Sequence, residues 1–276
     1  MTFEPEQLGQ SRTDLAQTLR ELRKRAGLTG DRLARRCNMS QSQISKFETG
    51  KKTPKLVDVE RILRALDAPA GIVEEVTALA RIANTEWQDK RSSWRRGMEK
   101  RQTELASLER ETVELRYFLP AMITGLLATS EYARASLAHT PGDSSKTVAR
   151  KLERQAVLYD TSKIFTFILT EQAARWALVP APAMAVQIDR LVSLSHLPNL
   201  RIGVIPIGTV MARGPMNTFT VYDNRLATVE NFTGRMVLRD SRDISEYLAV
   251  FSSFEQHAHF GDEARALLQQ WADACR

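Results

Sequence analysis

The sequence is poor in cysteine and has no long apolar run, and each absence excludes a class of protein. Cys37 and Cys275 are its two cysteines, too few for a disulfide framework and without the spacing of zinc ligands. No apolar run approaches the ~20 residues that a membrane-spanning helix needs. The first residues do not place a basic region before an apolar one, so no secretory signal is visible. We therefore expect a protein of the reducing cytoplasm that does not contact the membrane.

Catalytic motifs are missing as well. The sequence contains no Gly-x-Ser-x-Gly element, no phosphate-binding glycine loop and no His-Glu-x-x-His element. His257 and His259 flank Ala258, but on the helix predicted there two residues so spaced point about 200° apart, which speaks against a shared metal. His139 and His196 have no evident acidic or nucleophilic partner. We expect no catalytic residue, no metal site and no cofactor.

The charge of the chain is unevenly distributed. Its 276 residues, 43% of them hydrophobic, suffice for two ordinary domains of about 100–200 residues each. Residues 11–66 contain 14 Lys and Arg against 6 Asp and Glu, a charge of +8, while the net charge of the whole chain is +6, which leaves −2 for the remainder. A basic excess in one segment favours a nucleic-acid partner, because each neutralised phosphate releases counterions.

Residues 27–54 predict two short helices joined by a tight turn. Thr29 is placed to cap the first helix, and Ser40 with Gln43 forms a capping box at the start of the second. Ile44 and Phe47 share one face of the second helix and are expected to pack on the first. The opposite face is polar and lacks acids, which indicates either a solvated face or contacts with bases and phosphates. The residues predicted to contact DNA are Ser40, Gln41, Ser42, Gln43, Ser45, Lys46, Lys51 and Lys52.

Apolar spacing extends this motif to a small helical domain over residues 1–82. Helices are expected at 12–26, 54–66 and from residue 69 onward, and with the two helices of the motif they give five. Cys37 falls within this core, where a small buried residue is a simpler interpretation than a redox switch.

Residues 83–115 are charged and predict a connector helix. Trp87 and Trp94 are seven residues apart and share one helix face. This segment is interpreted either as a dimerising stalk or as a connector packed on its own second domain, because the heptad pattern is too short and interrupted for a coiled coil.

Residues 116–276 predict an α+β domain with a small mixed sheet. Residues 164–169 and 200–206 read as strands separated by helices, which suggests a parallel pair with a crossover connection. Residues 219–222 and 226–230 flank a turn and predict a hairpin. The other predicted elements are an apolar connector at 117–120, helices at 123–137, 144–159, 171–177, 182–195, 241–258 and 261–275, and a strand at 235–238.

The first segment resembles the helix-turn-helix of the XRE family, whose members have lambda-repressor-like domains. The resemblance covers about residues 13–66 and implies that DNA is the partner and that Arg23 pairs with Glu48, orienting the second helix of the motif against the first helix of the domain. The matching residues are Leu19, Leu22, Arg23, Gly27, Leu28, Leu33, Ala34, Ile44, Phe47, Glu48, Gly50 and Pro54.

The second segment resembles the domain of unknown function numbered 5753, or Scr1-like domain, of WhiJ-like actinobacterial regulators. Thr124 and Ala128 depart from the Pro and Gln that the family usually has, which alters any contacts of that loop. The resemblance implies a small partner protein of the type called domain of unknown function 397. The matching segments are Gly125-Leu126-Leu127-Ala128-Thr129-Ser130-Glu131-Tyr132-Ala133, Arg154-Gln155-Ala156-Val157-Leu158, Leu169-Thr170-Glu171, 199–206, Gly214-Pro215 and Val229-Glu230.

Candidate contacts of a partner or ligand follow from that segment. Glu171 also stands at a predicted strand end, where sites often form, although a buried and hydrogen-bonded carboxylate is the simpler interpretation. The candidates are Leu126, Leu127, Thr129, Tyr132 and Glu171.

Taken together, the sequence predicts a nucleoid-associated transcription regulator that binds a double-stranded operator as a homodimer, since one short helix reads few bases. The resemblance adds a modulating partner protein. The alternatives are a small-molecule sensor, the antitoxin-like half of a two-protein module and, least favoured, an enzyme tethered to DNA.

Overall fold

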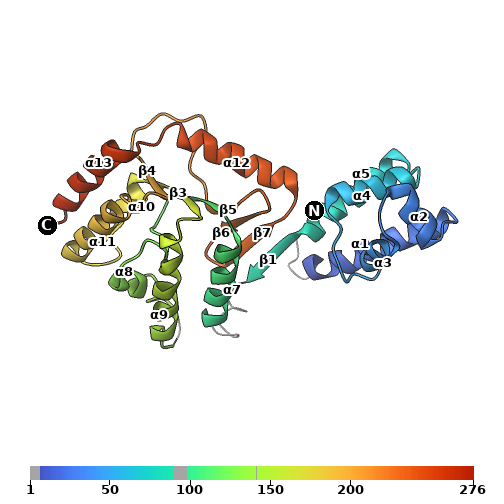
Figure 1. Ribbon diagram of the computed structural model, residues 1–276, viewed down its shortest axis with the longest axis horizontal. Helices are drawn as coiled ribbons and strands as arrows, with labels where there is room; N and C mark the ends of the chain where they lie inside the picture. The colour runs from blue at the N-terminus through green and yellow to red at the C-terminus, as the bar shows by residue number, and fades with distance from the viewer. Residues whose placement is uncertain (1–6, 90–97, 141) are drawn as a thin grey trace. The chain divides into compact units, whose positions relative to one another are not determined.

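The computed structural model describes residues 7–89, 98–140 and 142–276 of the chain. It divides into two compact units (Figure 1), of which one comprises the chain up to Trp87 with Met236–Asp243, and the other Gln88–Arg235 with Ile244–Arg276. Among the described residues, no helix is long and apolar enough to cross a membrane.

The first unit is built from the five helices that the sequence predicts. Their apolar faces enclose one core, in which Leu19, Leu33, Ile44, Phe47 and Ile62 are almost completely buried. The bounds of the helices are α1 Gln7–Arg25, α2 Gly30–Cys37, α3 Gln41–Glu48, α4 Leu56–Ala65 and α5 Ala70–Asn84.

Local hydrogen bonds set where α2 and α3 begin and where α2 ends. The hydroxyl of Thr29 accepts from the amide of Arg32, and the hydroxyl of Ser40 accepts from the amide of Gln43, each at 3.2 Å. These bonds satisfy amides that the first helical turn leaves without a partner. Asn38 ends α2 in the left-handed region, at φ 52°, and so turns the chain toward α3.

The second unit contains a mixed sheet. Within this unit the strands pair in the order β6-β5-β2-β3-β4, whereas Thr85–Trp87 of β1 and Met236–Leu238 of β7 belong to the first unit. Strand β2 is parallel to β3 and antiparallel to β5, β3 is parallel to β4, and β5 and β6 form an antiparallel hairpin. The bounds of the strands are β1 Thr85–Asp89, β2 Glu114–Leu119, β3 Ile164–Thr170, β4 Leu200–Ile205, β5 Thr218–Tyr222, β6 Leu226–Glu230 and β7 Gly234–Leu238.

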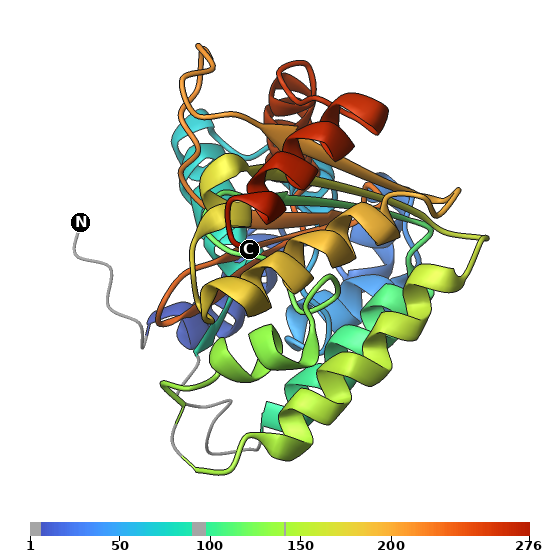
Figure 2. The ribbon, with the colours of Figure 1, turned by 90° about the vertical axis from the view of Figure 1, so that its left-hand side faces the viewer.

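Helices cover both faces of this sheet. Tyr117 and Phe167 stack at 4.7 Å between ring centroids on the face that α11 and α13 cover, and Figure 2 shows these two helices side by side. Phe118 points to the other face, because successive side chains of a strand alternate, and it stacks on Phe254 of α12 at 4.0 Å. The bounds of the helices are α7 Met98–Glu111, α8 Ser130–Ala135, α9 Ser145–Arg154, α10 Glu171–Arg175, α11 Ala181–Leu194, α12 Ser241–Glu255 and α13 Gly261–Asp273, with a 3-10 turn η1 at Gln155–Tyr159.

The connector helix expected over residues 83–115 is wrong as a single element. Helix α5 ends at Asn84, Thr85–Asp89 form β1, and the later helical part is α7, which packs on α9 of the second unit. Trp94 lies outside the described residues, as does the side chain of Trp87, so the two interpretations of their shared face stay predictions.

Two further expectations for the second unit are wrong. Residues 117–119 were expected to be a connector but belong to β2, which pairs on both sides. The helix expected over 123–137 is shortened to α8, because the chain before it runs in turns whose carbonyls accept hydrogen bonds from distant side chains.

A buried ion pair fixes α7 to α9. Glu109 is 1% exposed, and its carboxylate accepts two hydrogen bonds from Arg154, one of them at 3.0 Å from Nε. The same guanidinium donates to Gln102, and the hydroxyl of Tyr117 donates to Glu109 at 3.4 Å. Burial lowers the pKa of Arg154, but the attraction and hydrogen bonds of Glu109 outweigh it and leave that pKa above its usual value. Arg154 is therefore protonated, and both oxygens of Glu109 are hydrogen-bonded.

Replacing Arg154 by Ala is expected to lower the free energy of unfolding by about 3–5 kcal/mol, because Glu109 then remains buried without its counter-charge. The measurement is a denaturant titration of the full chain. Arg150→Ala, on the same helix, removes a pair with Glu153 whose two side chains are more than half exposed, and is expected to cost less than about 1 kcal/mol. Equal losses for the two variants would contradict the role given to the buried pair.

Candidate nucleic-acid interface

Helix α3 separates an apolar face from a polar one. Ile44 and Phe47 are 2% and 1% exposed and belong to the core of the first unit. The opposite face carries no acid and points to solvent. Of the residues expected to contact DNA, Gln43 is half-buried, and Ser40, Gln41, Ser42, Ser45, Lys46, Lys51 and Lys52 are exposed.

The start of α3 brings the backbone amides of a helix N-terminus together with exposed polar side chains. Ser40 caps the helix and also lies 3.2 Å from the hydroxyl of Ser42. The amide end of Gln41 lies 3.9 Å from the position that a side chain would take at Gly30, so Gln41 borders the N-terminus of α2. Helix N-termini attract anions, and Gln is suited to paired hydrogen bonds with adenine. These groups can therefore contact phosphates and base edges together.

Lys51 and Lys52 follow the left-handed Gly50 and lie outside the helix. The amide of Lys52 donates to the carbonyl of Lys46 at 3.1 Å, and its ammonium lies 5.9 Å from the ring centre of Phe47. Flexible ammonium groups of this kind are suited to backbone phosphates, whereas Lys46 lies on the exposed face of α3 itself.

Arg23 and Glu48 join α1 to the end of α3. Nε and one terminal nitrogen of Arg23 donate to the two carboxylate oxygens at 2.6 and 2.8 Å, and the other terminal nitrogen donates to the carbonyl of Leu28 at 2.8 Å. The hydrogen bond to Glu48 raises the pKa of Arg23 against the opposing effect of burial. This two-point contact fixes both the distance and the angle of α3 relative to α1.

The signature segment of the second unit, residues 125–133, is mostly core. Leu126, Leu127 and Tyr132 have no exposed surface, so in this conformation they shape the loop and do not reach a partner. Thr129 is half-buried and caps α8 by accepting from the amide of Tyr132 at 3.2 Å.

Two buried glutamines hold that segment. Gln155 donates to the carbonyls of Gly125 and Ala128, both at 2.8 Å. Gln187 donates to the carbonyl of Leu127 at 3.0 Å and accepts from the amide of Thr129 at 2.7 Å. Sequence reasoning missed both glutamines as positioning residues. The available signal was Gln187 itself, an amide in the middle of an apolar helix face.

Glu171 lies where the parallel strands end. One of its oxygens accepts from the amide of Ile207 at 3.0 Å, the other accepts from Arg175, and neighbouring Thr170 donates to the carbonyl of Pro120 at 2.8 Å. The loops that follow β2, β3 and β4 are therefore tied together at one edge of the sheet. Three large apolar side chains in the segments after β3 and β4 are exposed: Trp176, which follows α10, at 56%, Ile207 at 72% and Val210 at 90%.

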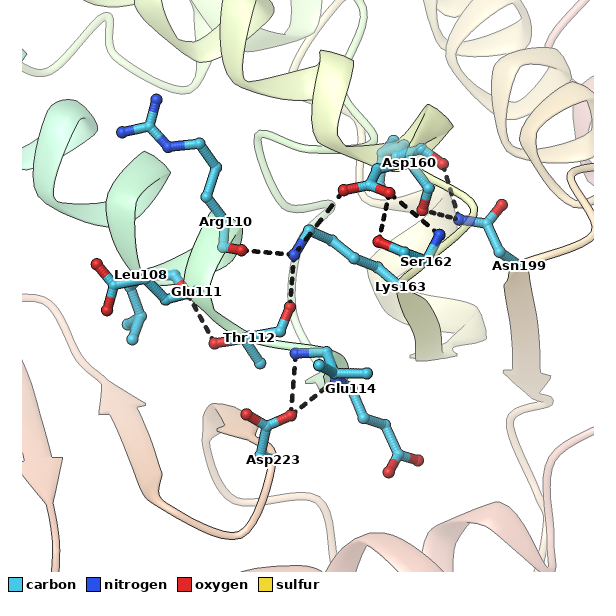
Figure 3. A network of polar contacts seen from close by, with 12 residues as sticks. Leu108, Arg110, Glu111, Thr112, Glu114, Asp160, Ser162, Lys163, Asn199 and Asp223 are labelled. Atoms are coloured by element: carbon cyan, nitrogen blue, oxygen red, sulfur yellow. Dashed lines mark hydrogen bonds and ion pairs between the residues drawn. The ribbon is translucent and has the colours of Figure 1, made fainter.

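The passage from α7 into β2 is clamped by side chains of other elements, as Figure 3 shows. Lys163, at the start of β3, donates to the carbonyls of Arg110 and Thr112 at 2.6 and 2.7 Å. Asp223, in the β5–β6 turn, accepts from the amide of Glu114 at 2.8 Å. A cation at the C-terminus of a helix also complements the helix dipole. These contacts position α7; they offer no reactive group.

His257 and His259, in the second unit, have separate partners. His257 contacts the carbonyl of Ser253 at 2.8 Å, and His259 contacts Glu263 at 2.9 Å. Within the described ranges, no group of three or more His, Cys, Asp or Glu residues is arranged to hold a metal ion.

Comparison with known proteins gives two family matches. The model described as Domain of unknown function (DUF5753) matches residues 102–270, more than half of the chain, and the model described as Helix-turn-helix domain matches residues 14–84. No curated protein matches.

A solved structure titled "Structure of TrmBL2, an archaeal chromatin protein, shows a novel mode of DNA binding." is similar over 64% of this chain and 53% of that chain. The identity is 9% and the TM-score 0.33. The chain thus spans about half the length of that structure, and no argument about function rests on this likeness.

Replacing Arg23 by Ala is expected to lower the free energy of unfolding by about 2–3 kcal/mol, because the carboxylate of Glu48, 10% exposed, loses its charged donors. DNA affinity is expected to fall with it, since α3 loses its orientation. Arg23→Lys keeps the charge but not the two-point contact and is expected to fall between. Thermal melting and duplex binding measure both effects. Unchanged melting with intact DNA binding would contradict the assignment.

Proposed function

The chain belongs to the family Domain of unknown function (DUF5753), and from this premise, with its helix-turn-helix, we propose that it is a transcription regulator whose second unit receives a modulating partner. Support for DNA binding comes from the helix-turn-helix match over residues 14–84 and from the charge of +8 on residues 11–66. One observation carries the proposal: α3 is capped at Ser40, packed through Ile44 and Phe47, and polar without acids on its outer face.

The regulator acts as a homodimer in this proposal. Helix α3 has eight residues, so one copy contacts few base pairs. Two copies on half-sites about 34 Å apart would read two major-groove segments on one face of the duplex. The mass of the complex on its operator tests this: two chains per duplex are expected, and a stable complex of one chain per full operator would contradict it.

The second unit serves recognition in this proposal. The resemblance to Scr1-like domains suggests a small protein of the domain of unknown function 397 type as the partner. The exposed Trp176, Ile207 and Val210, in the segments that follow β3 and β4, support a protein over a small ligand, because large apolar side chains left exposed suit a partner surface. Catalysis forms no part of the proposal.

Substitutions on the face of α3 and after its end are expected to change DNA binding differently. Lys46→Ala or Gln41→Ala should relax preference at particular operator positions by about 1–3 kcal/mol, because each removes a contact with base edges. Lys51→Ala should weaken binding to all sequences alike and reduce the salt slope by about one, because it removes a phosphate contact. Binding to a selected operator and to a scrambled duplex over a salt series measures both.

The reversed result would contradict the proposed placement of α3. If Lys51→Ala changed base preference while Lys46→Ala lowered both affinities equally, α3 would not lie in the groove as proposed. Glu21→Gln, a charge change on the exposed side of α1, serves as the control and is expected to leave base preference unchanged.

Modulation by the partner is tested with a purified small protein of the domain of unknown function 397 type. Adding it to the full chain is expected to change operator affinity at least tenfold, and Trp176→Ala with Ile207→Ser should abolish that response while leaving basal DNA binding intact. Val186→Ser on α11, 59% exposed, is the matched control and should respond normally. A normal response of the double variant would exclude this edge, and no response of the unmodified chain would exclude this partner.

A further inference from the structure

A basic hollow lies in the first unit, at the C-terminal ends of α2 and α4. It measures about 500 Å³ and is bordered by three arginines, Arg36, Arg61 and Arg64. Cys37 and Ala65 contribute apolar surface, and Asp67 is the acid among its lining residues. Three guanidinium groups against one carboxylate give the hollow a local charge of +2.

The three guanidinium groups keep most of their donors available. All three residues are exposed, and across the described parts of the chain none of them takes part in an ion pair. Arg36 donates to the carbonyl of Ala65 at 3.2 Å, which holds it across the hollow, toward α4. An arginine has five N–H donors in one plane, so the single bond from Arg36 to Ala65 leaves donors that can bind an anion.

The hollow is distinct from the surface that is proposed to contact DNA, the exposed face of α3. That surface borders the N-terminus of α2, where Gly30 lies beside Gln41. The hollow borders the C-terminus of α2, from Arg36 to Asn38. The eight residues of α2 place its two ends about 10 Å apart, at 1.5 Å per residue. None of the lining residues of the hollow belongs to α3.

We infer that this hollow is a second binding site, which takes an acidic segment of a protein through Arg36, Arg61 and Arg64. Two carboxylates balance its local charge of +2, and the arginine fork matches a carboxylate with two parallel hydrogen bonds. The apolar floor at Cys37 and Ala65 receives the methylene groups of Asp and Glu side chains. The inference goes beyond the proposed function, because it concerns the first unit and holds whether or not the second unit receives a partner.

An acidic protein segment fits this site better than a DNA backbone. A duplex is a stiff rod whose phosphates spread along its surface, and it is expected on the outer face of α3, none of whose residues line the hollow. A peptide can place two neighbouring carboxylates into one hollow. Arginine is also enriched in the cores of protein interfaces, where it combines charge with a flat stacking surface.

The test measures binding of a fluorescein-labelled hexaglutamate peptide to the full chain by anisotropy at low and moderate salt. Arg36→Ala, Arg61→Ala and Arg64→Ala are combined in one variant. A matched variant combines Arg20→Ala, Lys24→Ala and Arg25→Ala, which removes the same charge from exposed positions of α1. Thermal melting of each variant checks that it folds, and Arg61→Gln with Arg64→Gln is the milder substitute if the triple variant melts early.

The expected result is at least a tenfold loss of hexaglutamate affinity for the hollow variant and less than a twofold change for the matched variant. A saturating scrambled duplex should leave the bound peptide in place. Equal losses in the two variants would show attraction by net charge alone and overturn the inference. Displacement of the peptide by the duplex would assign the hollow to the DNA surface, and failure of the unmodified chain to bind hexaglutamate would overturn the site outright.

Discussion

The second unit depends on one electrostatic constraint: a carboxylate with almost no access to water must be matched by a cation. Glu109 is 1% exposed and Arg154 supplies the match, so α7 and α9 have one arrangement in which the charge is satisfied. Lys163 and Asp223 then hold the passage from α7 into β2 from two sides. Because β2 pairs with both β3 and β5, these contacts also define where the middle of the sheet begins.

The first unit uses the same chemistry for another purpose. Arg23 and Glu48 are also an arginine and a carboxylate in two-point contact, but they join the ends of two helices and are partly accessible to water. Their effect is orientation of α3, whose outer face must stay free for other contacts. The two pairs show how one interaction serves packing where it is buried and alignment where it lies near a surface.

Elements fixed by neighbouring residues could be predicted from the sequence, and elements fixed from a distance could not. Helices α2 and α3 follow from Thr29, Ser40 and Gly50, whose effects reach only a few residues. Strand β2 reads as a connector, because its apolar run ends at Pro120 and its strand character depends on pairing with β3 and β5. The loop before α8 has helical spacing, yet Gln155 and Gln187 hold its carbonyls.

For the candidate interface, exposure of Gln41 and Lys46 follows from helical period alone. The hollow beside Arg36 needed coordinates, since its arginines come from two helices.

Gln155 and Gln187, which hold residues 125–129, have a consequence for how this loop responds to pH and salt. Amide side chains carry no charge and do not titrate, and the bonds from Gln155 and Gln187 are shielded from solvent. The bonds that these two glutamines make to the loop therefore do not change with pH, and their burial protects them from the salt that weakens contact with DNA. A rise in salt that weakens contact with DNA phosphates would therefore leave these bonds to the loop in place.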